Sequence, residues 1–133
     1  MLISIVIPAF NEAKYLPVSL EAAHRSRAVL GQAGWTSEVI VCDNNSTDDT
    51  AAVAKDNGAR VVFEQFNQIA ASRNAAARAA RGDWLVFVDA DTQVTPKLFR
   101  EMMRAMVRDD CLGGGCPVKF DSGPWLGRQS VTV

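Results

Sequence analysis

Short apolar runs alternate with longer amphipathic segments along most of this chain. Four runs with strand character occupy residues 2–7, 38–42, 60–64 and 84–88. Segments with helical character cover about residues 12–30, 47–57, 67–81 and 96–108. Alternating strands and helices are typical of βαβ units, so the pattern predicts an α/β fold with a mainly parallel sheet. Because most of the strand runs are apolar on both faces, we expect helices on both sides of that sheet.

Polar residues before the helical segments indicate where those helices begin. Asn11 precedes the first helical segment and Ser46 precedes the second, and both residue types commonly cap helices. Ser46 also stands three residues before Asp49, which is the spacing of a capping box. We therefore expect Asn11 to cap the first helix, and Ser46, Asp48 and Asp49 to cap the second. Residues 118–120 are apolar enough to add a strand at the sheet edge.

The length and charge of the chain limit its function. It has 133 residues and a net charge of −1, from 14 basic and 15 acidic residues. We expect residues 1–133 to form a single domain, without nucleic acid as a partner, because no basic excess is present. No apolar run approaches the roughly 20 residues that span a bilayer, so no transmembrane segment is expected. We expect a cytoplasmic protein, and leave open peripheral membrane attachment and a homo-oligomer.

Polar residues stand where the expected strands end. The first run is followed by residues 8–12, the second by residues 43–46 and the fourth by residues 89–92. In open parallel α/β sheets, ligands bind at the carboxyl ends of the strands. This edge therefore gathers four acidic side chains, namely Glu12, Asp43, Asp89 and Asp91. Like charges repel one another, so the sequence predicts a cation or hydrogen-bond donors among them.

Asp89 and Asp91 are the strongest candidates for metal ligands. They lie two residues apart, so in an extended chain both carboxylates point the same way. Mg²⁺ and Mn²⁺ prefer oxygen ligands, and water and phosphate oxygens would complete the shell. Such an ion would neutralise charge on a diphosphate leaving group. The alternative is that Asp91 and Thr92 only begin the turn before residues 95–96.

The roles of two further residues depend on their surroundings. Asp43 stands at a strand end before the expected cap, free to accept hydrogen bonds from a base or ribose. Arg73 lies in an alanine-rich helical segment. It would contribute only if the face carrying Ala70 and Asn74 looks toward the strand ends, and otherwise it belongs to a solvated face. His24 stands among charged residues, and nothing around it indicates a function.

Several common sites are absent from the sequence. The segment after the first strand has no Gly-x-Gly-x-x-Gly, which argues against dinucleotide binding, and there is no P-loop motif. The single histidine fits neither a Ser-His-Asp set nor a zinc site. The cysteines lack the spacing of a disulfide framework or a metal motif, and we expect ordinary small apolar residues at Cys42, Cys111 and Cys116.

Four motifs, taken together, carry a family resemblance. They are ISIVIPAFNE at residues 3–12, EVIVCDNNSTD at 38–48, SRN at 72–74 and GDWLVFVDAD at 82–91. In this order and spacing they resemble the family 2 glycosyltransferases, over residues 2 to about 110. The resemblance implies the GT-A fold. It also implies transfer of a sugar from a nucleoside diphosphate, such as a UDP- or GDP-sugar, to an acceptor hydroxyl, with inversion of the anomeric centre.

The resemblance also implies residue roles. Asp91 would ligate Mn²⁺ or Mg²⁺, and Asp89 would contact the ribose or the metal and its waters. Glu12 would lie near the base and ribose, Asp43 would bond the base edge, and Arg73 would lie near the ribose or diphosphate. The implied nucleotide-binding set is Pro8, Ala9, Phe10, Glu12, Asp43, Arg73, Asp89 and Ala90.

The sequence also departs from the family pattern. Residues 43–46 read DNNS where the family commonly has DDGS, and Gln68 stands where a glycine often precedes the Arg-Asn pair. The family's catalytic base is an acidic residue after the metal motif. The acidic residues that follow here stand in no matching motif: Asp109, Asp110 and Asp121. We therefore expect the catalytic base beyond Val133. We also expect residues 1–133 to lack most of the acceptor-binding half.

Three other functions stay open from sequence alone. A nucleotide-sugar-binding module without transfer activity would share the donor site and lack the base. A nucleotidyltransferase would normally carry a Gly-rich basic loop after the first strand, which is absent here. A receiver-like signalling domain would need a lysine at a later strand end, and Lys119 is a poor candidate. The sequence specifies neither the sugar nor whether the acceptor is a glycan, a lipid or a small molecule.

Overall fold

The structure, a computed structural model, describes residues 1–116. The chain divides into two compact units, Met1–Arg100 and Glu101–Val133. All strands of the described chain lie in the first unit, as do all residues predicted for the site. The strand expected at residues 118–120 lies outside the described residues.

The described chain alternates strands and helices in the predicted order. The strands are β1 (Leu2–Ala9), β2 (Thr36–Asp43), β3 (Arg60–Phe63) and β4 (Trp84–Phe87). The helices are α1 (Leu16–Gln32), α2 (Thr50–Asp56), α3 (Ile69–Ala79) and α4 (Pro96–Met106). Within residues 1–116, none of the helices has the length and apolar character that crossing a bilayer requires.

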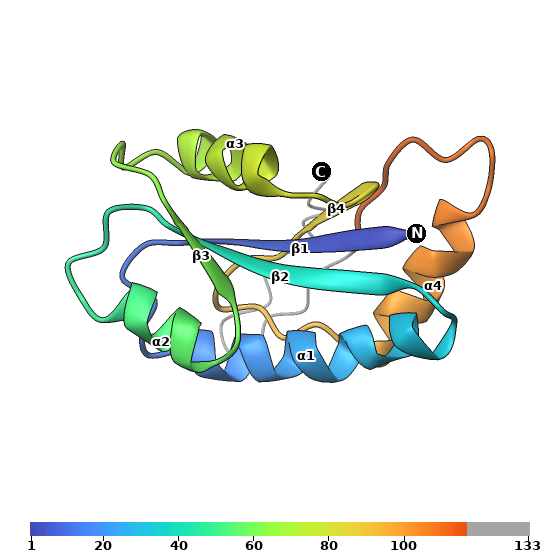
Figure 1. Cartoon of the computed structure of the whole chain (residues 1–133), viewed down its shortest axis with the longest axis horizontal. Helices are drawn as coiled ribbons and strands as arrows, with labels where there is room; N and C mark the ends of the chain where they lie inside the picture. Colours follow the sequence, from blue (N-terminus) through green and yellow to red (C-terminus); the bar gives the residue numbers. More distant parts are fainter. Residues whose placement is uncertain (117–133) are drawn as a thin grey trace, which may run out of the picture. The chain divides into compact units, whose positions relative to one another are not determined.

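The strands form one sheet in the order β3-β2-β1-β4, and every neighbouring pair is parallel (Figure 1). Central β1 pairs with β2 on one side and with β4 on the other, so that Ser4 stands opposite both Glu38 and Leu85. The chain winds outward from β1 to β3 and then returns through α3 to the far side of β1. The winding therefore reverses between β1 and β4, which is where open α/β sheets bind ligands.

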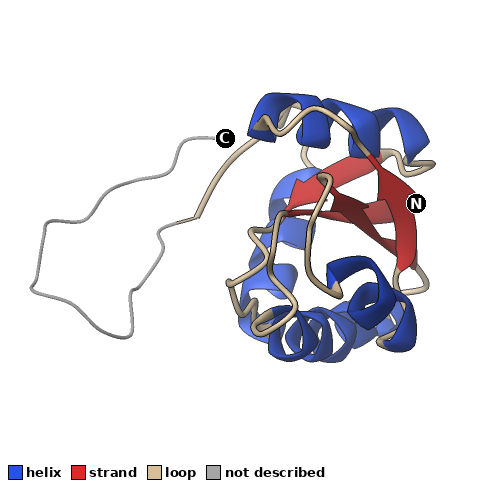
Figure 2. Cartoon of the chain, turned by 90° about the vertical axis from the view of Figure 1, so that its left-hand side faces the viewer, coloured by secondary structure: helices blue, strands red, loops and turns tan. Residues whose placement is uncertain are grey.

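Helices cover both faces of the sheet, which Figure 2 shows in red between them. α3 packs on β1, β2 and β3, whereas α1 and α2 pack on the opposite face. Beneath α3, a fully buried cluster joins Val6, Ile40 and Cys42 with Ala76. The other face of β1 carries fully buried isoleucines at Ile3, Ile5 and Ile7. The predicted α/β fold with helices on both faces of a mainly parallel sheet is confirmed.

The cysteines do not pair with one another. Cys42, Cys111 and Cys116 are all free. Burial raises the pKa of the Cys42 thiol, so this side chain stays protonated in the core. Cys42 thus behaves as the small apolar residue that the sequence predicts.

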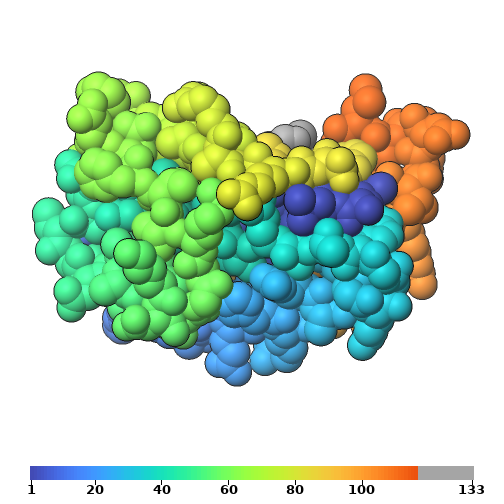
Figure 3. Space-filling model, viewed as in Figure 1, coloured from blue at the N-terminus to red at the C-terminus, as the bar shows by residue number. Residues whose placement is uncertain are grey.

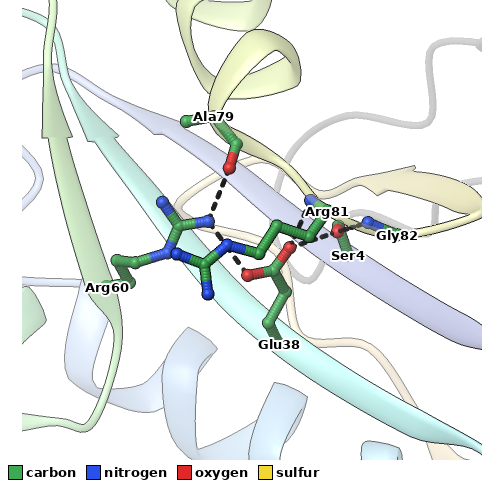
Figure 4. A network of polar contacts seen from close by, with 6 residues as sticks. All are labelled: Ser4, Glu38, Arg60, Ala79, Arg81 and Gly82. Carbon is green, nitrogen blue, oxygen red and sulfur yellow. Dashed lines mark hydrogen bonds and ion pairs between the residues drawn. The ribbon is translucent and has the colours of Figure 1, made fainter.

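A polar network joins β1, β2 and β3 to the connection between α3 and β4 (Figure 4). Glu38 Oε1 accepts hydrogen bonds from Ser4 Oγ at 2.6 Å and from the Arg81 amide at 2.7 Å. Arg60 Nη2 donates to Glu38 Oε2 at 2.9 Å and to the Ala79 carbonyl at 2.6 Å. A partly buried charge is tolerated only when it is paired and hydrogen-bonded, and this carboxylate has both kinds of partner.

Gly82 allows the α3–β4 connection to pass very close to β1. Its amide donates a hydrogen bond to Ser4 Oγ at 2.8 Å. A Cβ atom at this position would lie 2.6 Å from both the amide nitrogen and the hydroxyl oxygen of Ser4. Because backbone atoms of a central strand cannot move aside easily, the approach requires glycine.

Two predicted capping residues, Asn11 and Ser46, do not stand at the starts of their helices, whereas Asp49 does occupy the N-cap position of α2. α1 begins at Leu16 and α2 at Thr50, and in neither helix does the N-cap side chain bond the first turn. Asn11 and Ser46 instead meet across two loops, where the Asn11 amide donates to Ser46 Oγ at 3.0 Å. Asp48 does bond the start of α2, because its Oδ1 accepts from the amide of Thr50, the first residue of that helix, at 2.9 Å. Short polar side chains satisfy amides of a helix start and of a neighbouring loop equally well, so local sequence does not distinguish these outcomes.

Candidate functional site

The carboxyl ends of β1, β2 and β4 meet at one edge of the sheet, which faces the reader in Figure 2. The pairing continues beyond the strands. The Asn44 amide donates to the Ala9 carbonyl at 2.8 Å, and the Val88 amide donates to the Val6 carbonyl at 2.9 Å. The structure therefore brings together the segments that follow these strands, as the sequence leads us to expect.

Residues 89–91 combine an anchored backbone with exposed carboxylates. Ala90 is 3% exposed, and its carbonyl accepts a hydrogen bond from Ser19 Oγ at 2.6 Å. Asp89 and Asp91 flank this buried residue, and both are exposed. The Thr92 amide donates to the Asp89 carbonyl at 2.9 Å, so these residues form a turn that ends at Thr92. That turn uses a carbonyl and leaves the two carboxylates to other partners.

Ser19 and Ser26 of α1 are structural parts of the site that the sequence analysis did not identify. Both are buried, and Ser26 Oγ donates to the Val94 carbonyl at 3.2 Å. They hold the loop after β4 along α1 (Figure 1). Two small hydroxyl residues spaced two helical turns apart share one face of a helix, and this spacing is the signal that would have indicated them.

Glu12 and Asp91 lie close enough to affect each other. Burial raises the pKa of Glu12, and the negative charges of Asp91 and Asp48 raise it further. The Glu12 amide is held by a hydrogen bond to Thr50 Oγ1 at 3.0 Å. This edge thus carries the negative potential that the sequence predicts, and a cation would relieve it.

Asp43 is less available than the sequence indicates. It is 8% exposed, and its Oδ1 accepts a hydrogen bond from the Ser46 amide at 3.0 Å. The expectation of a free carboxylate therefore applies only to the other oxygen, Oδ2. Next to it, Asn44 Oδ1 is buried without a hydrogen-bond donor in the described part of the chain. Such an acceptor needs a donor from water or a ligand.

Arg73 on α3 reaches the same edge. Its Nη2 lies 3.4 Å from Asp89 Oδ1, and its guanidinium carbon lies 5.7 Å from the centre of the Phe87 ring. Its Nε is buried and has no acceptor within residues 1–116. The Arg73 side chain therefore does reach the strand ends.

The remaining residues of the predicted nucleotide set differ in exposure. Phe10 is 49% exposed, and Pro8 is half-buried. Ala9 and Ala90 are each 3% exposed, so they offer almost no side-chain surface. Their carbonyls accept hydrogen bonds that hold the loops, which makes them parts of the backbone support.

The connection between β3 and α3, with the residues that flank it, carries exposed apolar side chains that the sequence motifs do not indicate. Phe63, Phe66 and Ile69 are each more than 60% exposed. In Figure 3 this connection, in light green, forms outer surface at the upper left. Asn67 Nδ2 donates to the Asn44 carbonyl at 2.7 Å, which ties the connection to the loop after β2.

The residues present suit a hard cation that shares its shell with other ligands. Within residues 1–116, no group of three or more His, Cys, Asp or Glu side chains is placed to hold a metal ion. Asp89 and Asp91 are both exposed at this edge, and a hard cation such as Mg²⁺ or Mn²⁺ bound to them would take its other ligands from water and phosphate. Burial is the main cause of the raised pKa of Glu12, and the charges of Asp91 and Asp48 add to it.

An open parallel sheet with exposed carboxylates at its switch point and an arginine beside them places the chain among the doubly wound α/β domains. Residues 4–131 match the sequence model of glycosyl transferase family 2. The match covers nearly the whole chain, and the chain belongs to this family.

Curated relatives agree with this assignment. An uncharacterized glycosyltransferase of Mycobacterium tuberculosis is 33% identical over 135 residues. The alignment covers 98% of this chain and 56% of that protein. The chain therefore spans little more than half the length of this relative.

Solved structures agree as well. Mannosyl-3-phosphoglycerate synthase from Rubrobacter xylanophilus matches with a TM-score of 0.68 at 24% identity, over 83% of this chain and 37% of that one. Glucosyl-3-phosphoglycerate synthase from Mycobacterium tuberculosis was solved with Mn²⁺, uridine diphosphate and glucosyl-3-phosphoglycerate. It matches with a TM-score of 0.66 at 26% identity, over 81% and 40% of the two chains. The expected GT-A fold is confirmed.

Proposed function

We propose that this chain binds the nucleoside diphosphate of a nucleotide-sugar donor, with a divalent cation at Asp89 and Asp91, for an inverting sugar transfer. One observation carries the proposal: both carboxylates are exposed at the switch point of the sheet, on a backbone anchored by Ser19. Family membership supports sugar transfer in general and favours it over nucleotidyl transfer or signalling. The relative solved with Mn²⁺ and uridine diphosphate supports the metal and a UDP-sugar donor.

Each residue has a proposed task. Asp91 ligates the cation, and Asp89 contacts the cation with its waters or the ribose. Arg73 leaves its weak contact with Asp89 and meets the diphosphate, since its Nε lacks an acceptor in the described residues. Asp43 offers Oδ2 to the edge of the base, because Oδ1 is already bonded to a backbone amide. Glu12 lies near the base and ribose.

The apolar surface of the proposed site and its backbone support come from different residues. Pro8 and Phe10 line the nucleotide with apolar surface, and the exposed Phe10 ring provides most of it. Ala9 and Ala90 contribute through their backbone bonds rather than their side chains. A half-apolar, half-charged site of this kind suits a flat base joined to a diphosphate.

The proposed chemistry is a single displacement at the anomeric carbon of the sugar. An acceptor hydroxyl oxygen forms the new bond while the bond to the diphosphate oxygen breaks on the opposite side, and a base takes the hydroxyl proton. A bound cation supplies charge neutralisation for the leaving diphosphate. This chain's residues hold the nucleotide, and Arg73 adds positive charge where negative charge develops.

We place the base and the acceptor site outside residues 1–133, which form the donor-binding domain. The length of the mycobacterial relative, of which the alignment covers 56%, supports this placement. Asp110 forms an exposed ion pair with Arg108 at 2.8 Å. Asp121 lies outside the described residues.

The test is calorimetric titration of the chain with UDP and GDP, with and without Mn²⁺. We expect one nucleotide to bind, and Mn²⁺ to tighten its binding at least about tenfold, which equals 1.4 kcal/mol. Asp91→Asn should abolish the effect of Mn²⁺. Asp56→Asn, which changes an exposed aspartate on α2, should leave it intact. Binding of neither nucleotide, or a metal effect that survives in Asp91→Asn, would contradict the proposal.

A nucleotide-sugar-binding module without transfer activity is the second candidate. The partial coverage of the mycobacterial relative favours it for this stretch of chain, because residues 1–133 match only 56% of that protein. The two candidates differ in turnover. Binding of a UDP-sugar without release of UDP is expected of residues 1–133 under both candidates, and measured release of UDP would exclude the binding module.

A further inference from the structure

The loops that follow β1 and β2 are fastened together by side chains outside the proposed ligand contacts. The Asn11 amide donates to Ser46 Oγ at 3.0 Å. In return, Asn11 Oδ1 accepts hydrogen bonds from the Thr47 amide at 2.8 Å and from Thr47 Oγ1 at 3.2 Å. These bonds join residues that lie more than 30 positions apart in the sequence.

A second set of bonds continues the same attachment. Asp48 Oδ2 accepts from the Ala13 amide at 3.2 Å, and Thr50 Oγ1 accepts from the Glu12 amide at 3.0 Å. Asp48 Oδ1 also accepts from the Thr50 amide at 2.9 Å and from its hydroxyl. We call the five side chains that make these bonds the loop clasp: Asn11, Ser46, Thr47, Asp48 and Thr50.

Asn11 has an unusual backbone conformation within the loop clasp. Its φ is 52°, in the left-handed region that residues other than glycine rarely adopt. Asparagine tolerates this region better than most residues, but such a conformation persists only where surrounding contacts hold it. The hydrogen bonds from Thr47 are contacts of this kind.

The loop clasp touches the proposed nucleotide site from both sides. Asn11 stands between Phe10 and Glu12, so its conformation sets the direction of both neighbours. Ser46 links the two sides, because its amide donates to Asp43 Oδ1 at 3.0 Å while its hydroxyl accepts from Asn11. We propose that Asn11 and Ser46 are positioning residues that hold residues 10–12 and the Asp43 carboxylate ready for the nucleotide.

This inference rests on the proposed function, and it makes a separate claim about affinity. The apparent affinity for a ligand falls in proportion to the fraction of molecules whose loop is in the binding conformation. Loss of one or two hydrogen bonds between the loops should therefore raise the dissociation constant about three- to tenfold. The core under the sheet does not depend on these bonds, so the chain should stay folded.

The variants separate backbone conformation from hydrogen bonding. Asn11→Gly keeps access to a positive φ and removes the acceptor for Thr47. Ser46→Ala removes the hydroxyl and keeps the amide that bonds Asp43, whereas Ser46→Thr restores a hydroxyl. Calorimetric titration with UDP or GDP and Mn²⁺ should show weaker binding for Asn11→Gly and Ser46→Ala. Ser46→Thr should bind within about twofold of the wild type, because its hydroxyl can accept the same bond.

Asn57→Ala is the matched control. Asn57 Nδ2 donates to the Val53 carbonyl at 2.8 Å at the far end of α2, so this variant loses a comparable bond away from the site. Its unfolding midpoint should fall about as much as that of Asn11→Gly, while its affinity stays at the wild-type value. Equal loss of affinity in Asn57→Ala would show general destabilisation and overturn the positioning role.

Two failures can be told apart. Wild-type affinity in folded Asn11→Gly and Ser46→Ala, beside a wild-type chain that binds, would overturn the positioning role alone. Absence of nucleotide binding by the wild-type chain would overturn the proposed function and the positioning role together. Ser46→Ala decides the matter if Asn11→Gly does not fold, because it leaves the strained residue unchanged.

Discussion

The two ends of the parallel sheet treat charge in opposite ways. In the Glu38 network, each carboxylate oxygen has a donor, and Arg60 balances its charge. At the strand ends, no ion pair involves Asp91 within the described residues, and Asp89 has only the 3.4 Å contact with Arg73. One end therefore contributes stability, whereas the other keeps charge available for a ligand.

The pKa values record this difference. Burial raises the pKa of Glu38, but hydrogen bonds from Ser4, the Arg81 amide and Arg60, with the charge of Arg60, outweigh it and leave the pKa lowered. Burial and nearby carboxylates leave the pKa of Glu12 raised. The fold therefore stabilises the charged form of Glu38 and destabilises the charged form of Glu12. A binding site commonly carries such a cost to stability.

Removing the Glu38 side chain should have the largest effect. Glu38→Ala leaves Arg60 without its ion pair and the Ser4 hydroxyl and Arg81 amide without an acceptor. We expect a loss of about 3 kcal/mol in the free energy of unfolding, measured by urea denaturation. Glu21→Ala is the control, because its ion pair with Arg25 spans 4.0 Å on the surface and should matter little. Similar losses in both variants would remove the contrast between the network and ordinary surface charge.

Gly82→Ala should have the next largest effect. The new methyl group would meet the Ser4 backbone, so we expect a loss of about 2 kcal/mol in unfolding free energy. Gly31→Ala on α1 is the matched control, because a Cβ there meets nothing within 4 Å. That variant should gain about 0.5 kcal/mol, since alanine favours helix. A neutral Gly82→Ala would show that the connection can move away from β1.

The Glu38 network should also weaken in acid. The folded-state pKa of Glu38 lies below its ordinary value of 4.5, so its contribution is fully present above that value. It is lost as the pH falls through the lowered pKa, because the unfolded chain then binds the proton first. Urea denaturation from pH 7 to about pH 3 should show the wild type and Glu38→Gln converging as the pH falls. A constant difference between them would contradict the role of the charge.

The smallest predicted effect concerns Arg73 at the opposite end. Without nucleotide, Arg73→Ala should bind Mn²⁺ about twofold more tightly, because the arginine no longer competes for Asp89. With nucleotide and Mn²⁺ together, the same variant should bind more weakly. Arg78→Ala, an exposed change on the same helix, should alter neither titration. Changes of the same sign in both titrations would show that Arg73 does not exchange between the carboxylate and the nucleotide.

Much of the fold and part of the site follow from the sequence. The alternation of apolar runs and amphipathic segments predicts every described strand and helix, because burial imposes a different period on each. The parallel sheet then places Glu12, Asp43, Asp89 and Asp91 at one edge without any knowledge of contacts. These predictions succeed because they depend on which side of each strand or helix is buried. The spacing of apolar residues along the sequence specifies that side.

Tertiary structure decided which polar groups met. The sequence predicts Asn11 and Ser46 as helix caps, but in the fold they bond each other across two loops. The sequence predicts an Asp43 carboxylate free to bind a ligand, but one of its oxygens accepts a hydrogen bond from the Ser46 amide. Nothing in the local sequence indicates a partner for Glu38, which bonds Arg60 on a neighbouring strand. A hydrogen bond needs only a donor and an acceptor at the right distance, and the sequence lists these groups without stating which ones the folded chain brings together.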